Sequence, residues 1–293
     1  MELSVLIVNY NAEPVLRDCL HAVYRNTVER PLEVLVVDNA SSDGSLTMLA
    51  RDFPEVQVIA SQENLGFSRG NNLAIQAARG RYLLLLNNDT LVTPGALDTL
   101  LRLIKARPEV GALGPLLRNA DGSVQISYGR MIGFRAELLQ KLLFALSSRG
   151  NPLVARYLEW RARREAHPDW VSGACILLRA DVLRQVGALD ENFFMYTEEV
   201  DLCHRIRNRG YRVLYSPEAE IVHLGGKSTE SNSEKAAIEY RRSQLYFYLK
   251  HYGRGRVRML KAYLLPKTAL AWLLGGPARR DLNHRLLRLV WDF

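Results

Sequence analysis

Apolar and polar residues over the first 90 positions alternate in the manner of buried strands and amphipathic helices. Apolar runs are typical of strands covered on both faces, and they occupy residues 34–37 and 83–86 without interruption and residues 3–8 and 56–59 with one polar residue each. Between them, apolar residues recur at helical spacing over 13–26, 43–52 and 67–79. Such short connections favour parallel pairing with right-handed crossovers. The pattern predicts an α/β fold with a mostly parallel central sheet flanked by helices.

The later part of the chain is less regular. Thr93 is a predicted N-cap with Pro94 at the first helical position. Other predicted elements are strands over 110–117 and 171–178, a short helix from Asp181, and extended pieces over 211–215 and 220–223. Periodicity further predicts a helical insertion within 131–168 and a helical extension over 231–293. We therefore divide the chain into segments 1–118, 119–230 and 231–293.

Composition restricts the class of protein. A chain of 293 residues with 48% apolar content can bury a large core. The cysteines Cys19, Cys175 and Cys203 have unrelated spacings, so neither a metal set nor a disulfide framework is expected, and a reducing, cytoplasmic compartment is the default. The first residues enter a strand directly, so we expect no signal peptide, and no charge-free apolar run approaches the ~18 residues of a membrane span.

The net charge of +8 is unevenly distributed. Residues 130–168 carry eight basic and three acidic side chains, and residues 241–293 carry twelve basic and two acidic ones. The rest of the chain is mildly acidic. Basic helices that also carry aromatic and leucine residues are typical of peripheral attachment to an anionic membrane, and a solvated appendage or a dimer interface is the alternative. Nucleic-acid binding is disfavoured, because no recognition motif accompanies the charge.

Polar side chains follow the predicted strands at the point where each ends. Asn9 and Asn11 follow the first, Asp38 the second, and Asn64 lies beyond the third. The run Asn87-Asn88-Asp89 follows four leucines, a position that packing does not explain. Because ligands bind beyond the carboxyl ends of the strands in open α/β sheets, we expect one polar ligand-binding edge.

Two of these positions suit a nucleotide. Asp38 can accept a hydrogen bond from a ribose hydroxyl or a base N–H, although it could instead cap the helix near Asp43. Arg69 lies in a segment with two glycines at a predicted helix start, which favours a phosphate, although a solvated arginine is the alternative. The glycines do not match Gly-x-Gly-x-x-Gly, so a dehydrogenase is disfavoured.

Two further positions suit a metal. Asp89 can bind a hard divalent cation that completes its coordination with phosphates and water, although a simple turn residue is the alternative. His223 ends an alternating strand before two glycines, although a lone histidine is more often structural. The following Gly226-Lys227-Ser228 is not a P-loop, because that motif requires glycine where Ile221 stands.

Three acids follow an aromatic cluster near residue 195. Glu198, Glu199 and Asp201 could be ordinary acids of a helix N-terminus, which the dipole favours. The alternative is a general base, whose proton affinity apolar walls and neighbouring carboxylates can raise.

Taken together, these motifs resemble family 2 glycosyltransferases of the GT-A fold, a Rossmann-like fold, and in particular the bacterial branch that contains rhamnosyltransferases. The resemblance covers roughly 3–230 apart from 131–166, in ordered blocks at 4–11, 36–45, 64–72, 86–90, 170–174, 187–194, 198–202 and 223–226.

The resemblance implies a role for each candidate residue. Donor binding would involve Asn9, Asn11, Asp38, Asn64, Arg69, Asn87 and Asn88. Asp89 and His223 would bind Mg²⁺ or Mn²⁺, and Trp170, Ser172 and Gly173 would contact the acceptor. Relatives have Glu-Asp where this chain has Glu198-Glu199, which makes Glu199 the base, with Glu198 and Asp201 as alternatives. Segment 1–118 would be the nucleotide-sugar-binding half and 119–230 the acceptor-binding half.

The implied activity is inverting transfer of a sugar from a nucleotide diphosphate-sugar to a hydroxyl of a glycan or lipid-linked glycan, in bacterial cell-surface polysaccharide synthesis. Deoxythymidine diphosphate-rhamnose (dTDP-rhamnose) is the favoured donor, with uridine or guanosine diphosphate hexoses as alternatives. A sugar-nucleotide-binding module without turnover is the other class of function. The expected location is the inner, cytoplasmic face of the cell membrane, with peripheral attachment and no nucleic-acid partner.

Overall fold

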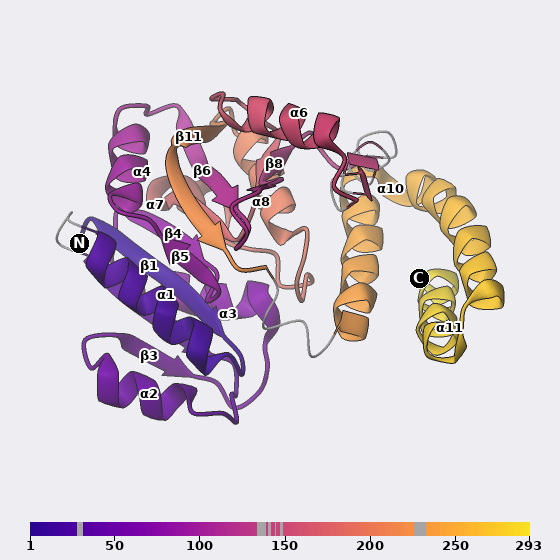
Figure 1. Ribbon diagram of the computed structural model, residues 1–293, viewed down its shortest axis with the longest axis horizontal. Coiled ribbons are helices and arrows are strands. Elements are labelled where there is room, and N and C mark those ends of the chain that lie inside the picture. The colour runs from indigo at the N-terminus through magenta and orange to yellow at the C-terminus, as the bar shows by residue number, and fades with distance from the viewer. Residues whose placement is uncertain (28–31, 134–138, 140–141, 144, 147–148, 226–232) are drawn as a thin grey trace. The chain divides into compact units, whose positions relative to one another are not determined.

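The computed structural model of the chain comprises two compact units (Figure 1). The first contains the described residues of 1–190 and 199–228, and the second contains those of 191–198 and 229–293. The structure describes residues 1–27, 32–133, 139, 142–143, 145–146, 149–225 and 233–293.

Nine strands of the described chain form the main sheet of the first unit, in the order β3-β2-β1-β4-β10-β6-β11-β5, with β7 paired to β6. The strands are β1 (Leu3–Asn9), β2 (Leu32–Asp38), β3 (Gln57–Ala60), β4 (Tyr82–Leu86), β5 (Thr90–Val92), β6 (Val110–Arg118), β7 (Val124–Gln125), β10 (Cys175–Arg179) and β11 (Arg212–His223). Strands β1, β2, β3, β4, β6 and β11 run in one direction, and β5, β7 and β10 run against them. The predicted α/β fold with a mostly parallel sheet is confirmed.

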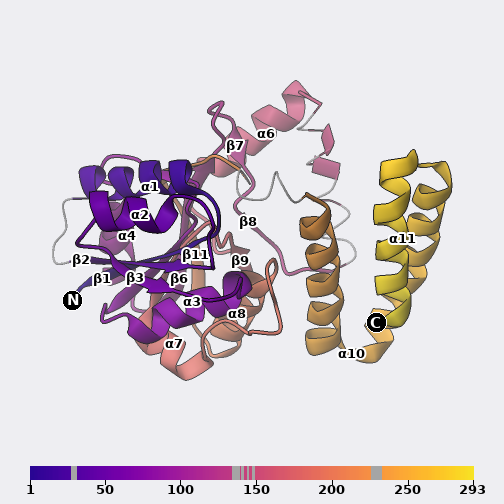
Figure 2. The same cartoon turned by 90° about the horizontal axis from the view of Figure 1, so that it is seen from below.

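Helices cover both faces of this sheet (Figure 2). One face carries α1 (Glu13–Asn26), α2 (Ser45–Asp52) and α4 (Ala96–Lys105), and the other carries α3 (Gly66–Ala77), α7 (Ala180–Val186) and α8 (Glu198–Asn208). Each helix in the first 90 residues lies within a few residues of its predicted bounds. Because the sheet is covered on both sides, every residue of β4 is buried, which explains its unbroken apolar sequence.

Three local predictions were wrong. Thr93 is not a helix cap, because α4 begins after Gly95, and the Thr93 hydroxyl donates instead to the Glu220 carbonyl at 2.6 Å. The strand predicted over 171–178 is two strands, β9 (Trp170–Val171) and β10, separated by a turn. The pieces predicted over 211–215 and 220–223 are the single strand β11, whose pairing with β6 shifts between Ser216 and Glu220.

The predicted helical insertion lies partly outside the described residues. Within the described part, α6 (Pro152–Ala162) is capped by Asn151, whose side chain accepts from the backbone N–H groups of Leu153 and Val154. The helix ends sooner than predicted, because Ala166 already pairs with Tyr215 in an antiparallel bridge. Before the insertion, β8 (Tyr128–Gly129) pairs with β9 in a second, two-stranded sheet.

The second unit contains α10 (Ser233–Leu274) and α11 (Pro277–Asp292). Gly253 interrupts α10 with a φ of 74°, so the helix turns there into a second half, and α11 runs back beside that half (Figure 1). The predicted C-terminal helical extension is confirmed in its secondary structure. None of the helices in the described part of the chain combines the length and apolar character needed to cross a membrane.

Candidate active site

Asn9, the last residue of β1, joins the ends of three neighbouring strands. Its Nδ2 donates to Asp38 Oδ1 at 3.1 Å and to Ser45 Oγ at 2.9 Å. Its Oδ1 accepts from Asn88 Nδ2 at 2.9 Å. All four residues are buried. Polar residues at the carboxyl ends of β1, β2 and β4 therefore meet in one hydrogen-bonded cluster, as the strand pattern predicts.

The turn after β2 is held in a tight conformation by Asp38. Ala40 has a φ of 60°, in the left-handed region that residues with a Cβ rarely adopt. This conformation brings the Ser41 N–H to Asp38 Oδ2 at 2.9 Å, and Ser41 Oγ in turn accepts from the Asn11 N–H at 2.9 Å. A carboxylate has about four lone-pair sites, so Asp38 can still accept from a ligand.

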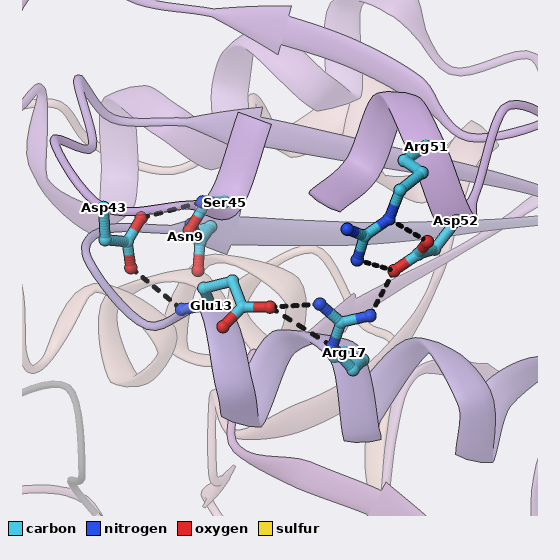
Figure 3. A network of polar contacts seen from close by, with 7 residues as sticks. All are labelled: Asn9, Glu13, Arg17, Asp43, Ser45, Arg51 and Asp52. Atoms are coloured by element: carbon cyan, nitrogen blue, oxygen red, sulfur yellow. Dashed lines mark hydrogen bonds and ion pairs between the residues drawn. The ribbon is translucent and has the colours of Figure 1, made fainter. Parts of the chain in front are cut away.

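Asp38 is not the cap of α2, which was the alternative interpretation. The N-cap position of α2 belongs to Gly44. Just before it, Asp43 accepts at Oδ1 from the Ser45 N–H and at Oδ2 from the Glu13 N–H, both at 3.0 Å (Figure 3). Asp43 thus joins the first residues of α1 and α2. Farther along the same two helices, Arg17 of α1 contacts Asp52 of α2, which keeps the helices adjacent behind the site.

Arg69 lies in the first turn of α3, at the rim of the same edge. Its side chain is 50% exposed and lies 3.9 Å from Glu63. The start of α3 is held in place by Asn64, whose Oδ1 accepts from the Gly66 N–H at 3.0 Å, and by Asn39, whose Nδ2 donates to the Gly66 carbonyl at 3.0 Å. The helix N-terminus and Arg69 are therefore tied to the turn that contains Asp38.

His223 meets Asp89 because of strand register. In the antiparallel pair of β11 and β5, His223 lies opposite Thr90, and its Nε2 is 3.2 Å from Asp89 Oδ1. Its Nδ1 lies 2.8 Å from Oε1 of Gln125. An amide oxygen only accepts, so Nδ1 carries a proton, and in the neutral ring Nε2 is left with its lone pair. Asn87 Nδ2, at 3.3 Å, can donate to that lone pair.

The donor set at Asp89 and His223 suits a divalent cation. A carboxylate oxygen and an unprotonated ring nitrogen both offer electron pairs, and a metal-binding histidine usually donates its other N–H to an acceptor such as Gln125. No group of three or more His, Cys, Asp or Glu side chains within the described ranges could hold a metal ion. Two protein ligands leave room for substrate phosphates and water, which Mg²⁺ in particular retains.

Glu199 packs on a glycine of the turn between β9 and β10. It lies in the first turn of α8 and packs on Gly173, where an added Cβ would come within 3.3 Å of the Cβ of Glu199. The next residue, Ala174, accepts at its carbonyl from the Asn87 N–H at 2.9 Å. Gly173 therefore leaves room for Glu199 beside the residue that bonds to Asn87, and a side chain at position 173 would press on the Cβ of Glu199.

The neighbouring acids lie in different surroundings. Glu198, the first residue of α8, is 5% exposed, which is unusual for an acid of a helix N-terminus. Asp201 is fully buried, and its Oδ2 accepts from Arg205 Nε at 2.8 Å. Arg205 also donates to the backbone carbonyls of Val186, Gly187 and Ala188. These contacts favour a structural task for Asp201.

The residues assigned to the acceptor are largely buried. The indole N–H of Trp170 donates to the Arg130 carbonyl at 2.8 Å, and its ring lies against Gly129. The Ser172 N–H donates to the Ser127 carbonyl at 2.7 Å. Trp170 therefore holds the paired strands β8 and β9 together, and Ser172 continues that pairing toward Gly173.

The first 187 residues carry a recognisable family signature. The family model described as "Glycosyl transferase family 2" matches residues 4–187. The N-acetylglucosaminyl-diphospho-decaprenol L-rhamnosyltransferase of Mycobacterium tuberculosis is 31% identical over 311 aligned positions, which cover 98% of this chain and 97% of that protein. The chain belongs to glycosyl transferase family 2. Rhamnosyltransferase WbbL of Escherichia coli K12 is a more distant relative of this glycosyltransferase, 22% identical over 79% of the chain and 87% of that protein.

Solved structures agree on the fold. The mannosyltransferase PcManGT of Pyrobaculum calidifontis, solved with GDP-Man and Mn²⁺, matches with a TM-score of 0.59 and 19% identity over 98% of this chain and 69% of that one. GalNAc-T7, solved with UDP, GalNAc and Mn²⁺, matches with a TM-score of 0.60 and 15% identity over 100% of this chain and 56% of that one. The glycosyltransferase therefore has the GT-A fold.

Three residues of the glycosyltransferase site were not among the sequence candidates. Ser41 and Ser45 bond to the Asn9 amide, and their position in the polar turn after β2 could have indicated them. Gln125 gave no such signal, because it lies on the two-residue strand β7 and reaches His223 only through sheet pairing.

Proposed function

We propose that this glycosyltransferase moves rhamnose from dTDP-rhamnose to a hydroxyl of a lipid-linked glycan, with inversion at the anomeric carbon. Support comes from the mycobacterial relative, whose name specifies an L-rhamnosyltransferase and a polyprenyl diphosphate-linked acceptor, and which matches nearly end to end. The observation that carries the proposal is the pairing of Asp89 with His223 at the sheet edge. It is supported by Glu199, which packs on Gly173 next to Ala174, whose carbonyl accepts from the Asn87 N–H.

The nucleoside end of the donor is assigned to the Asn9 cluster. Asp38 and Asn11 would contact the nucleoside, since they lie at the carboxyl ends of β2 and β1. The diphosphate is assigned to Arg69, Asn64 and the N-terminus of α3, where helix N–H groups and a guanidinium attract negative charge. Asn87 and Asn88 would contact the donor between these two regions.

Asp89 and His223 are the residues we assign to a divalent cation, Mg²⁺ or Mn²⁺. When bound, the cation would neutralise charge that develops on the departing nucleoside diphosphate. The two structural neighbours were solved with Mn²⁺, which supports the use of a divalent cation in this fold. Gln125 would keep the Nε2 lone pair of His223 directed at the site.

Glu199 is the residue we assign as general base. Its carboxylate would take the proton from the acceptor hydroxyl as that oxygen bonds to the anomeric carbon. The bond from that carbon to the diphosphate oxygen breaks on the opposite face, and the nucleoside diphosphate leaves with the electron pair. General base help of this kind contributes about 10²–10⁴ in rate. We assign to Gly173 the role of leaving room for the Glu199 side chain. Trp170 and Ser172 are assigned to the part of the site that binds the acceptor.

The acceptor is proposed to lie at the membrane surface, where the protein would attach. The second unit carries the basic segment 241–293, and leucines near the end of α10 are exposed. An amphipathic surface of this kind suits peripheral attachment to anionic lipid. We place the reaction at the inner, cytoplasmic face, where free buried thiols such as Cys19, Cys175 and Cys203 are stable. Residues 1–118 would serve the donor and 119–230 the acceptor.

A transfer assay tests the proposal. The full chain is incubated with dTDP-rhamnose, Mg²⁺ or Mn²⁺, and a short-chain N-acetylglucosaminyl diphosphate lipid, and the lipid product is analysed by mass spectrometry and for anomeric configuration by NMR. We expect addition of one deoxyhexose with inversion. UDP- and GDP-hexoses in parallel test the alternative donors. Donor binding without release of nucleoside diphosphate would indicate a binding module, and retained configuration would contradict the mechanism.

A further inference from the structure

The first half of α10 packs on the short segment that leads into α8. Within the second unit, Ser243 Oγ donates to the backbone carbonyl of Met195 at 2.8 Å, and the Ser243 side chain is buried. Phe193 lies in an edge-on contact with Tyr246, with ring centroids 4.8 Å apart. A polar and an aromatic contact therefore fix the two ends of residues 193–195.

Two further contacts extend this packing along α10. Tyr196 meets Tyr240 edge-on, with ring centroids 6.0 Å apart. The ammonium group of Lys235 lies 5.1 Å from the centre of the Phe194 ring, a cation–π distance. Contacts thus recur on α10 at residues 235, 240, 243 and 246, and every residue from Phe193 to Tyr196 has a partner on the helix.

The backbone is strained at the last of these residues and at the next one along the chain. Tyr196 and Thr197 have φ values of 71° and 66°, in the left-handed region. A β-branched residue such as Thr197 is rarely found there, and such a conformation persists only where its surroundings impose it. The contacts from α10 are placed to impose it, because they end one residue before Thr197.

The strained turn leads directly into the start of α8, where the acids lie. Glu198 follows Thr197 directly and begins the helix, and Glu199 is the second residue of that helix. We propose that Ser243, Tyr240 and Tyr246 are positioning residues, which hold the turn at 193–197 so that Glu199 is presented to the acceptor. This role rests on the proposed function of Glu199, and it gives α10 a task in catalysis separate from membrane attachment.

Substitution of Ser243 tests the inference in the full-length chain. Ser243→Ala removes one hydrogen bond from the turn, and Leu249→Ala, on the same helix at a 37% exposed side chain, is the control. We expect amide hydrogen exchange of the peptide 191–198 to be about fivefold faster in Ser243→Ala only. With a water-soluble acceptor we expect kcat to fall by up to about 10²-fold with an unchanged KM for the donor.

A second substitution distinguishes loss of the positive-φ turn at 196–197 from a general loosening of the second unit. Glycine adopts positive φ without strain, so Thr197→Gly combined with Ser243→Ala should recover part of the lost kcat. Exchange and kcat equal to those of Leu249→Ala would overturn the inference, and so would a double variant without recovery. The exchange measurement needs no turnover, so it decides whether α10 holds the turn even if the wild-type chain transfers no sugar.

Discussion

His223 Nε2 lies 3.2 Å from Asp89 Oδ1, and strand pairing between β11 and β5 holds the two side chains together. If this pair binds a divalent cation, Asp89→Asn should weaken nucleoside diphosphate binding in the presence of Mn²⁺ by at least about tenfold, or about 1.4 kcal/mol. Binding in EDTA should be unchanged. Isothermal titration with dTDP measures both conditions.

Asp121→Asn is the matched control for that measurement. Asp121 lies in an exposed turn and accepts from the backbone N–H and hydroxyl of Ser123, so its loss should leave the Mn²⁺ dependence intact. An Asp89→Asn protein that retains the full enhancement by Mn²⁺ would remove Asp89 from metal binding.

Gln125 should affect metal binding without contact to the ion. Gln125→Leu removes the acceptor that faces His223 Nδ1, so the ring can turn or change tautomer. Loss of such an orienting partner typically costs about 10–100-fold in metal affinity. Gln125→Glu keeps an acceptor at the same place and should retain affinity. Mn²⁺ titration followed by electron paramagnetic resonance measures the affinity, and equal values for both variants would contradict the role.

Substitutions of Glu199 and Asp201 should have different effects, the first on the rate of transfer and the second on folding stability. Glu199→Gln removes the proposed base, so kcat should fall by about 10²–10⁴ while donor binding and melting temperature stay near wild type. Asp201→Asn breaks a buried pair with Arg205, which we expect to cost about 3 kcal/mol of folding stability. Transfer kinetics and thermal unfolding separate the two effects, and full turnover by Glu199→Gln would exclude it as the base.

Glu33 should make stability depend on acid pH. Burial alone would raise the pKa of Glu33, but hydrogen bonds from Ser4 and from the backbone and side chain of Arg79 outweigh it and hold the pKa below its usual range. A lowered pKa in the folded state means that the carboxylate stabilises the fold above the ordinary glutamate pKa of about 4.3, and that this contribution is lost as pH falls through the folded-state value.

Glu33→Gln should therefore lower stability by about 2 kcal/mol near pH 7, since a buried charged acceptor is lost. The difference from wild type should shrink as pH falls below about 4. Glu218→Gln, at an exposed ion pair with Arg102, is the control and should change stability by less than about 1 kcal/mol. Denaturant titrations at several pH values measure both, and a constant difference for Glu33→Gln would contradict the assignment.

The sequence could predict the parts of the site that lie at the ends of buried strands. Apolar runs that stop at Asn9, Asp38 and Asn87 identify the strand ends, and parallel pairing then brings those ends to one edge. The position of β10 between β4 and β6 was not predictable, because local pattern does not encode which distant strand fills a gap in a sheet. The same holds for Gln125, which meets His223 only through the pairing of β7, β6 and β11.

The membrane prediction concerns the end of α10. Leu270, Leu273 and Leu274 are 56%, 60% and 78% exposed, and Arg279 and Arg280 follow in α11. Each leucine that enters the interface contributes about 1.5–3 kcal/mol, and the arginines add attraction to anionic lipid that salt weakens.

Replacing Leu273 and Leu274 together by Asp should therefore lower sedimentation with phosphatidylglycerol vesicles by well over about tenfold. Leu46→Asp, at a 40% exposed leucine of α2, is the control and should sediment as wild type does. Neutral vesicles should bind less of the wild-type chain, because they offer no negative charge to attract the basic side chains. Equal sedimentation of the double variant and wild type would show that this end of α10 does not enter the bilayer. The basic segment 241–293 would then have a structural role and would not serve as a membrane anchor.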